Sequence, residues 1–203
     1  MASEDREETS RIEAFSDGVF AIAITLLVLT LQVPHVHGGL WRALLDEWPQ
    51  FAGYVASFAI IGIMWVNHHS MFKTIVRSDR VLLFLNLLLL FWTALLPFPT
   101  NLIARYLGDG GTDAAVAEAV YSANLTLAAI AFSLIWIHAV RGGRLIARPL
   151  TPTAERQAIV RFAMGTLVYA ATIGISFLSP GAALAIQFVI AVYYVFEQLA
   201  PSS

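Results

Sequence analysis

The chain contains no cysteine among its 203 residues, and only 13% of the residues are charged. Without cysteine there can be no disulfide, no thiolate nucleophile and no cysteine-ligated metal site. A soluble domain typically has about 25% charged residues, so this chain has too little charge to cover a water-facing surface. The net charge of −2 also lacks the basic footprint of nucleic-acid binding, and we expect no nucleic-acid partner.

Sequence signatures of enzymes are also missing. The chain has no Gly-rich phosphate loop, no HExxH zinc motif and no GxSxG nucleophile motif. We therefore predict that the protein is not an enzyme, that it has no catalytic residues and that it needs no cofactor.

Apolar residues are abundant instead, at 58% of the chain with a mean hydropathy of +0.72. In lipid a segment must satisfy its own backbone hydrogen bonds, so long apolar runs become helices of about 20 residues. Six runs fit, and we predict an all-α integral membrane protein with one domain over residues 1–203. The expected helices cover about 12–33, 50–74, 80–104, 114–140, 156–178 and 182–199, with a kink at Pro97 and Pro99.

The basic residues predict the orientation of these helices. Ten of the twelve Lys and Arg lie in the N-terminal tail, between the second and third helices, or around the loop 141–156. Because such residues concentrate on the cytoplasmic side, we predict a multi-pass protein of the cell membrane with both termini in the cytoplasm. The basic loop can also contact anionic lipid headgroups. The ten residues are Arg6, Arg11, Lys73, Arg77, Arg80, Arg141, Arg144, Arg148, Arg156 and Arg161.

The first expected helix carries Asp17 inside an apolar span, where a carboxylate is costly unless it has a partner. The topology places Asn67, His68, His69 and Asn86 at a similar depth on the next two helices. We therefore expect an intramembrane hydrogen-bonded network in which Asp17 meets His68 or His69. It would either clamp the helices or add pH sensitivity through a histidine beside a carboxylate. A metal site is not expected, because adjacent histidines point about 100° apart on a helix.

A different face of the same helix is apolar. At about 100° per residue, Ile22, Thr25, Leu26 and Leu29 lie within about 100° of arc. Asp17 points about 140° away from Ile22, so this face and the polar network look in different directions. Spacing alone favours ordinary lipid contact or helix packing for the apolar face.

The pattern R-x-x-x-F-S-D-G, at Arg11, Phe15, Ser16, Asp17 and Gly18, resembles the signature of the transmembrane protein 175 family. The next segment, A-I-A-I-T-L-L-V-L, and the segment W-V-N-H-H-S-M-F at 65–72 also resemble that family. Its members are potassium channels of bacteria, archaea and animal endosomes and lysosomes. With one six-helix repeat, the chain is similar to the bacterial form, which implies a homotetramer.

The resemblance also implies a role for the apolar face. In the family the first helix of each subunit lines a central pore in the oligomer. By position, Ile22 is implied to form a hydrophobic constriction, Leu26 and Leu29 further apolar layers, and Thr25 a hydroxyl layer that aids selectivity. Potassium is then the permeant ion. The chain has no TVGYG-like segment, so selectivity cannot come from a ladder of backbone carbonyls.

A proton-coupled or proton-permeable transporter is the alternative interpretation. Asp17 beside His68 or His69 could serve as a proton relay. Transporters often contain internal repeats or broken helices at mid-membrane. Neither feature is clear in this sequence, apart from Pro97 and Pro99.

Overall fold

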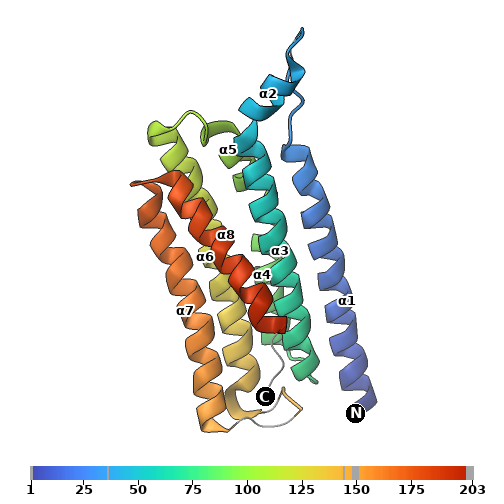
Figure 1. The fold of residues 1–203 in the computed structure, drawn as a ribbon. Helices are drawn as coiled ribbons and strands as arrows, with labels where there is room; N and C mark the ends of the chain where they lie inside the picture. The colour runs from blue at the N-terminus through green and yellow to red at the C-terminus, as the bar shows by residue number, and fades with distance from the viewer. Residues whose placement is uncertain (1, 36, 144, 148–150, 200–203) are drawn as a thin grey trace.

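The computed structural model describes residues 2–35, 37–143, 145–147 and 151–199, and these residues form a bundle of helices (Figure 1). The helices differ in length because prolines and polar connections interrupt the apolar runs. In chain order the elements are α1 (Ala2–Leu26), η1 (Leu27–Thr30), α2 (Leu40–Asp46), α3 (Trp48–Thr74), α4 (Arg80–Leu95), α5 (Pro97–Tyr106), α6 (Gly111–Val140), η2 (Arg141–Gly143), α7 (Pro152–Ser176) and α8 (Pro180–Leu199).

The first helix starts earlier and ends sooner than the expected range of about 12–33. α1 begins at Ala2, in a stretch rich in acidic residues, and negative charge near a helix N-terminus is favourable. Its last turn tightens into η1, and Leu31 is already extended, with φ −81° and ψ 121°. The chain therefore leaves the helix before it reaches Pro34, which cannot donate a backbone hydrogen bond.

The kink expected at Pro97 and Pro99 is confirmed. α4 ends at Leu95 and α5 begins at Pro97, so the third apolar run is two helices joined at Leu96. Proline removes a backbone donor and its ring crowds the preceding turn, which breaks the helix at this point. The short helix α2 was not predicted, since it lies in the polar connection before α3 rather than in an apolar run.

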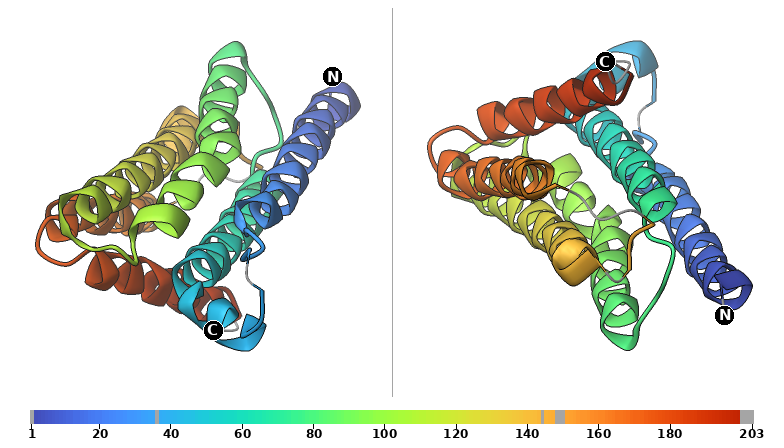
Figure 2. Two further views of the ribbon diagram at one scale, coloured as in Figure 1. Left: turned by 90° about the horizontal axis from the view of Figure 1, so that it is seen from above. Right: turned by 90° about the horizontal axis from the view of Figure 1, so that it is seen from below.

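The packing places α1 at one edge of the bundle and α7 at the other (Figures 1 and 2). α1 packs on α3 and α4, while α6 packs on α4, α5, α7 and α8, and α3 also contacts α5 and α8. The core between them is mainly apolar. Its largest buried members include Phe20, Leu27, Ile61, Leu89 and Ile135.

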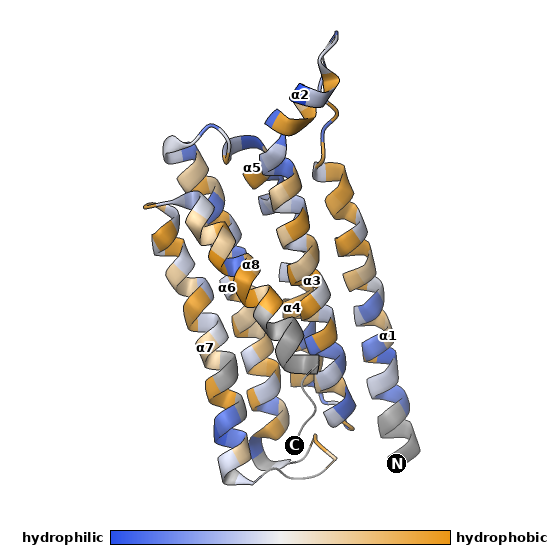
Figure 3. Cartoon of the chain, viewed as in Figure 1, coloured by the Kyte–Doolittle hydropathy of each residue, from blue (hydrophilic) through white to orange (hydrophobic). Residues whose placement is uncertain are grey.

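Four helical segments among the described residues are long and apolar enough to cross a membrane: 7–30, 48–74, 80–106 and 111–140. α7 and α8 add shorter apolar stretches, at 163–176 and 180–192. Hydrophilic residues gather toward one end of α1, α3 and α7 (Figure 3). Of the basic residues predicted to be cytoplasmic, Arg144 and Arg148 lie outside the described residues, and the side chains of Arg6 and Arg161 are likewise not described.

Two connections that the charge pattern assigns to the same side of the membrane lie side by side. An isolated antiparallel bridge pairs Ile75, just after α3, with Ile146, which precedes α7. The backbone N–H of Val76 donates to the carbonyl of Leu145 at 2.8 Å. The α3–α4 and α6–α7 connections are therefore joined at this end of the bundle.

Asp79 fastens the start of α4 at the same end. Its Oδ1 accepts a hydrogen bond of 2.8 Å from the backbone N–H of Leu82, as an N-cap does. His138 Nε2, near the end of α6, lies 3.0 and 2.9 Å from the two Asp79 oxygens. Burial raises the pKa of this carboxyl, but hydrogen bonds from Leu82, His138 and Val81 outweigh burial and hold the pKa below its ordinary value.

We predict that Asp79→Ala lowers the free energy of unfolding by about 1 kcal/mol, because the helix loses its cap. A lowered pKa in the folded state gives stability that is present above the ordinary aspartate pKa and is lost as the pH falls toward the folded value. The difference in the free energy of unfolding between the wild type and Asp79→Ala should therefore become smaller below about pH 4. Thermal unfolding in detergent across pH measures it, with Asp79→Asn as the control that retains a capping oxygen. An equal gap at every pH would contradict the prediction.

Candidate functional site

One side of α1 is buried in the bundle, and the other is uncovered in the single chain. Phe20 and Ala23 of α1 and Leu27 of η1 are at most 2% exposed, because α1 packs on α3 and α4 and η1 packs on α3 and α5. On the other side Ile22 is 61% exposed and Leu29 is 72% exposed. Large apolar side chains with this much exposed surface are typically covered by lipid or by another protein surface.

The uncovered stripe, as we name it, consists of Phe15, Ile22, Thr25, Leu26 and Leu29, all of them exposed. It contains every residue that the sequence assigns to the apolar face of the first helix. Leu29 lies in the tighter turn η1 rather than in α1, so its direction departs from that of a straight α-helix. The structure thus places the four apolar members along one line of the helix with a single hydroxyl group among them.

The Thr25 hydroxyl has a defined orientation. Its Oγ1 lies 2.9 Å from the carbonyl oxygens of both Ala21 and Ile22, to which the hydroxyl donates its hydrogen. A hydroxyl has one donor and two acceptor lone pairs. Since the donor is engaged with the helix backbone, the lone pairs are left for the exposed side.

A buried polar chain connects α1, α4 and α3. Asn86 Nδ2 donates to Ser16 Oγ at 3.0 Å, and Asn86 Oδ1 lies 2.9 Å from His68 Nε2. Ser16 Oγ in turn donates to the carbonyl of Ile12 at 2.8 Å. The His68 ring stacks on Phe72, with 4.3 Å between ring centroids. Ser16 and His68 are completely buried, so each depends on these contacts for its hydrogen bonding.

The expected contact of Asp17 with His68 or His69 was wrong. Asp17 Oδ1 instead accepts a hydrogen bond of 2.8 Å from Trp65 Nε1. His69 pairs through Nδ1 with the carboxylate of Glu13, one helical turn away. α1 and α3 lie side by side, so Glu13 pairs with His69 and Asp17 with Trp65 in two successive turns of the helices. We call these two pairs the rungs between α1 and α3. The rotation of α3 directs His68 away from Asp17.

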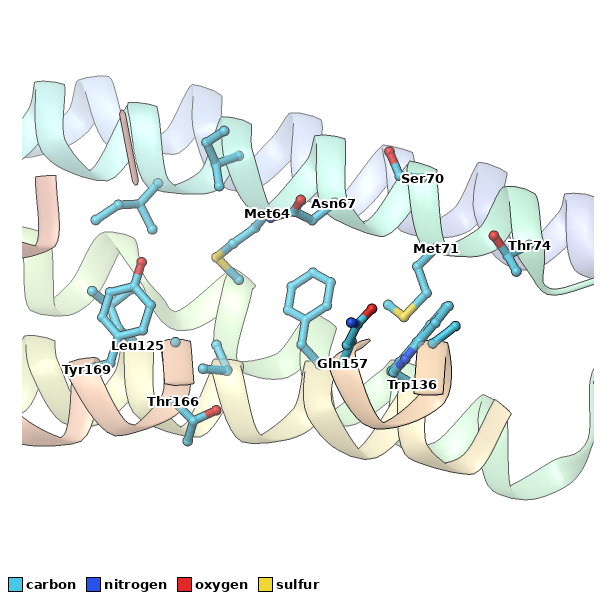
Figure 4. Close-up of a pocket in the computed structure, with 17 residues that line it drawn as sticks. Met64, Asn67, Ser70, Met71, Thr74, Leu125, Trp136, Gln157, Thr166 and Tyr169 are labelled. Carbon is cyan, nitrogen blue, oxygen red and sulfur yellow. The ribbon is translucent and has the colours of Figure 1, made fainter. Parts of the chain in front are cut away.

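Asn67, placed in the same network by the sequence, lies on another face of α3. It lines a cavity of about 440 Å³ between α3, α6 and α7 (Figure 4). Met64 and Met71 share its side of the cavity, while Gln157 and Tyr169 come from α7. The cavity is mostly apolar, with amide and hydroxyl groups at intervals along its wall.

The remaining motif residues, Arg11 and Gly18, are exposed on α1. Sequence reasoning missed Glu13 and Trp65, although their spacing held a signal. Glu13 and Asp17 are four residues apart, as are Trp65 and His69, so each pair shares one helix face. Among the described residues, no group of three or more His, Asp or Glu side chains is placed to hold a metal ion.

Comparisons with known proteins point to one family. The family model described as the endosomal/lysosomal potassium channel TMEM175 matches residues 11–97. A protein of Streptomyces collinus named as a potassium channel is 48% identical over 194 residues, which is 95% of this chain and 94% of that protein. The Gallus gallus protein named as the endosomal/lysosomal proton channel TMEM175 is 30% identical over 180 residues, 83% of this chain but 36% of that longer protein.

A solved structure extends the match over the whole bundle. It is described as a lysosomal potassium-selective channel TMEM175 homologue from Chamaesiphon minutus, and it is 38% identical to this chain. The TM-score is 0.84, with 96% of this chain and 100% of that chain covered, so the likeness includes α6, α7 and α8. The all-α membrane fold and the match at 48% identity over nearly the full length together establish that the chain belongs to the TMEM175 family of channel proteins.

Proposed function

We propose that the protein is a potassium-selective channel, leaky to other monovalent cations, whose pore is lined by α1 from each of several copies. The observation that carries the proposal is the uncovered stripe on α1, in a chain whose near full-length relative is named as a potassium channel. Potassium is the permeant ion, and no cofactor or catalytic residue is required.

The geometry of one subunit supports an oligomer. A single helix presents a single stripe, so a closed ring of pore-lining side chains requires several copies around an axis. We propose four copies, as the family resemblance implies, with α1 at the centre and lipid around the outer helices. The position of α1 at one edge of the bundle suits this arrangement, because the remaining helices do not separate it from a neighbouring subunit (Figure 2).

Ile22 is the proposed barrier. Four isoleucine side chains around an axis would form a narrow apolar ring, which gates by dewetting and forces an ion to shed water. Potassium holds its hydration shell less tightly than sodium, so it crosses such a ring more readily. Leu26 and Leu29 would extend the dry zone along the pore.

Thr25 is the proposed selectivity aid. Its hydroxyl donates its hydrogen to the backbone of its own helix, so the oxygen lone pairs remain available for a partly dehydrated cation. Four such oxygens in one layer would replace part of the water that the Ile22 ring removes. The selectivity then arises from side-chain oxygens next to an apolar constriction.

The membrane placement follows the positive-inside pattern. We propose that both termini and the joined α3–α4 and α6–α7 connections face the cytoplasm, in the cell membrane. The bridge between Ile75 and Ile146 supports one common side for these connections.

A proton pathway through Asp17 and the histidines is not favoured. Asp17 is hydrogen-bonded to Trp65, whose indole N–H only donates, so this contact cannot pass a proton onward. The relative named as a proton channel is matched over 36% of its length, whereas the Streptomyces collinus potassium channel is matched over 94%.

The direct test is a current measurement. The purified protein is reconstituted in a planar bilayer with potassium on one side and sodium on the other, and the reversal potential is read. A reversal near the potassium equilibrium potential is expected. If intact oligomers carry no such current, or if the current reverses near zero, a potassium-selective channel is ruled out under these conditions.

We predict that Ile22→Ala increases the single-channel conductance several-fold, because the smaller side chain widens the ring and lets it stay hydrated. Val28→Ala is the matched control, since Val28 is an exposed residue of the same helical region outside the uncovered stripe. Its conductance should equal that of the wild type. An unchanged conductance in the Ile22 variant would remove this residue from the barrier.

We predict that Thr25→Ala lowers the potassium-to-sodium permeability ratio by about fivefold. This change corresponds to about 1 kcal/mol, which is the typical net contribution of one hydrogen bond. Thr25→Ser keeps the hydroxyl and should retain the ratio. Reversal potentials under the same two-cation conditions measure both variants. A ratio that survives in the alanine variant would show that the hydroxyl has no part in selectivity.

A further inference from the structure

A second buried polar group lies on the far side of the subunit from the uncovered stripe. We name it the Glu118 cluster, and its members come from α6, α7 and α8. Every one of these side chains is completely buried. Glu118 stands about 10 Å along α6 from its first residue, inside a membrane-spanning segment. The members are Glu118, Ser122, Thr172, Ser176 and Gln187.

The hydrogen bonds in the cluster leave acceptors in excess of donors. Gln187 Nε2 donates to Ser122 Oγ at 2.7 Å and to Thr172 Oγ1 at 3.0 Å, which uses both amide hydrogens. Thr172 and Ser176 each donate to a backbone carbonyl of α7, at 2.6 and 2.7 Å. The Ser122 hydroxyl lies 3.3 Å from Glu118 Oε1, and the Gln187 amide is the other hydrogen-bonding group that acts on the carboxyl group.

Two oxygen atoms therefore remain without a donor. Glu118 Oε2 and Gln187 Oε1 are both buried, and neither has a hydrogen-bond partner. A buried carboxylate normally accepts several hydrogen bonds or pairs with a cation, because the charge is otherwise very costly to bury. One additional hydrogen on the carboxyl group would convert Oε2 from an unpartnered acceptor into a donor and would remove the charge.

No charged side chain among the described residues acts on Glu118 to offset a negative charge. Tyr121, one turn along α6, interacts electrostatically with Glu118 and with Tyr169 of α7, and its hydroxyl is bonded to Ser57 at 2.8 Å. Residues 180–192 of α8 contain no ionisable side chain. The ionisable residues of the other packed helices, Arg80 of α4 and Arg105 and Tyr106 of α5, are exposed.

We propose that Glu118 is a proton-binding site, with the carboxyl group protonated in the folded protein at neutral pH. The proton lies on Oε2, and the resulting O–H group donates within the cluster, where Gln187 Oε1 is the acceptor that lacks a donor. Loss of the proton leaves a negative charge among α6, α7 and α8, so these helices pack well only in the protonated form. The site is separate from α1, and its role does not depend on the proposed pore.

Infrared spectroscopy of the reconstituted wild-type protein at neutral pH tests the protonation directly. The expected result is a carbonyl band of a protonated carboxylic acid that shifts slowly on transfer to D₂O, since the group is buried. Glu118→Gln should abolish this band. Asp113→Asn is the matched control, because Asp113 is an exposed acid in the first turn of the same helix, and it should leave the band unchanged.

Absence of the band from wild type, or its persistence in Glu118→Gln, would overturn the proposal. Should the glutamine variant fail to fold, the wild-type spectrum decides alone: a slowly exchanging band supports the proposal, and a missing or immediately exchanging band contradicts it. Thermal stability adds a second readout. The folded state would hold a proton that the unfolded chain releases. The stability of the wild type relative to Glu118→Gln should therefore fall as the pH rises above the ordinary glutamate pKa.

Discussion

A polar side chain inside a bilayer must find its partner within the protein, and this requirement sets the order of the bundle. Ser16, Asn86 and His68 meet this requirement by joining α1, α4 and α3. Ser57 and Tyr121 do the same between α3 and α6. Apolar packing alone allows helices to slide or rotate against lipid-like neighbours, whereas these few directional contacts fix which helices meet and at what depth.

α1 is held to the bundle by polar contacts on one side, and it exposes an apolar surface on the other side. The rungs from Glu13 and Asp17 attach it to α3, and they set the rotation of the helix about its own axis. That rotation determines which residues face outward. The exposure of the uncovered stripe therefore depends on the hydrogen bonds of Glu13 and Asp17, which lie outside the stripe. Loss of either hydrogen bond would allow α1 to rotate, and Ile22 and Thr25 would change direction together.

Hydropathy and proline positions were sufficient to predict the apolar helices and the break at Pro97, because both depend on local backbone chemistry. The choice of partners was not predictable in the same way. A helical wheel gives the direction of Asp17 on its own helix, but the rotation of α3 decides whether Trp65 or His68 meets it. The same rotation places Asn67 against the cavity between α3, α6 and α7. Glu118 of α6 carries no functional signal in the sequence, because no recognisable motif surrounds it.

The orientation of the Thr25 hydroxyl has a consequence for the sign of charge that a ring of these residues tolerates. A hydroxyl free to rotate can turn its hydrogen toward chloride as easily as its oxygen toward a cation. With the hydrogen held by the helix backbone, the exposed surface of the group is electronegative only. In the proposed pore an anion would meet four repelling oxygens, so the hydrogen bond to the backbone favours cations over anions without an acidic side chain.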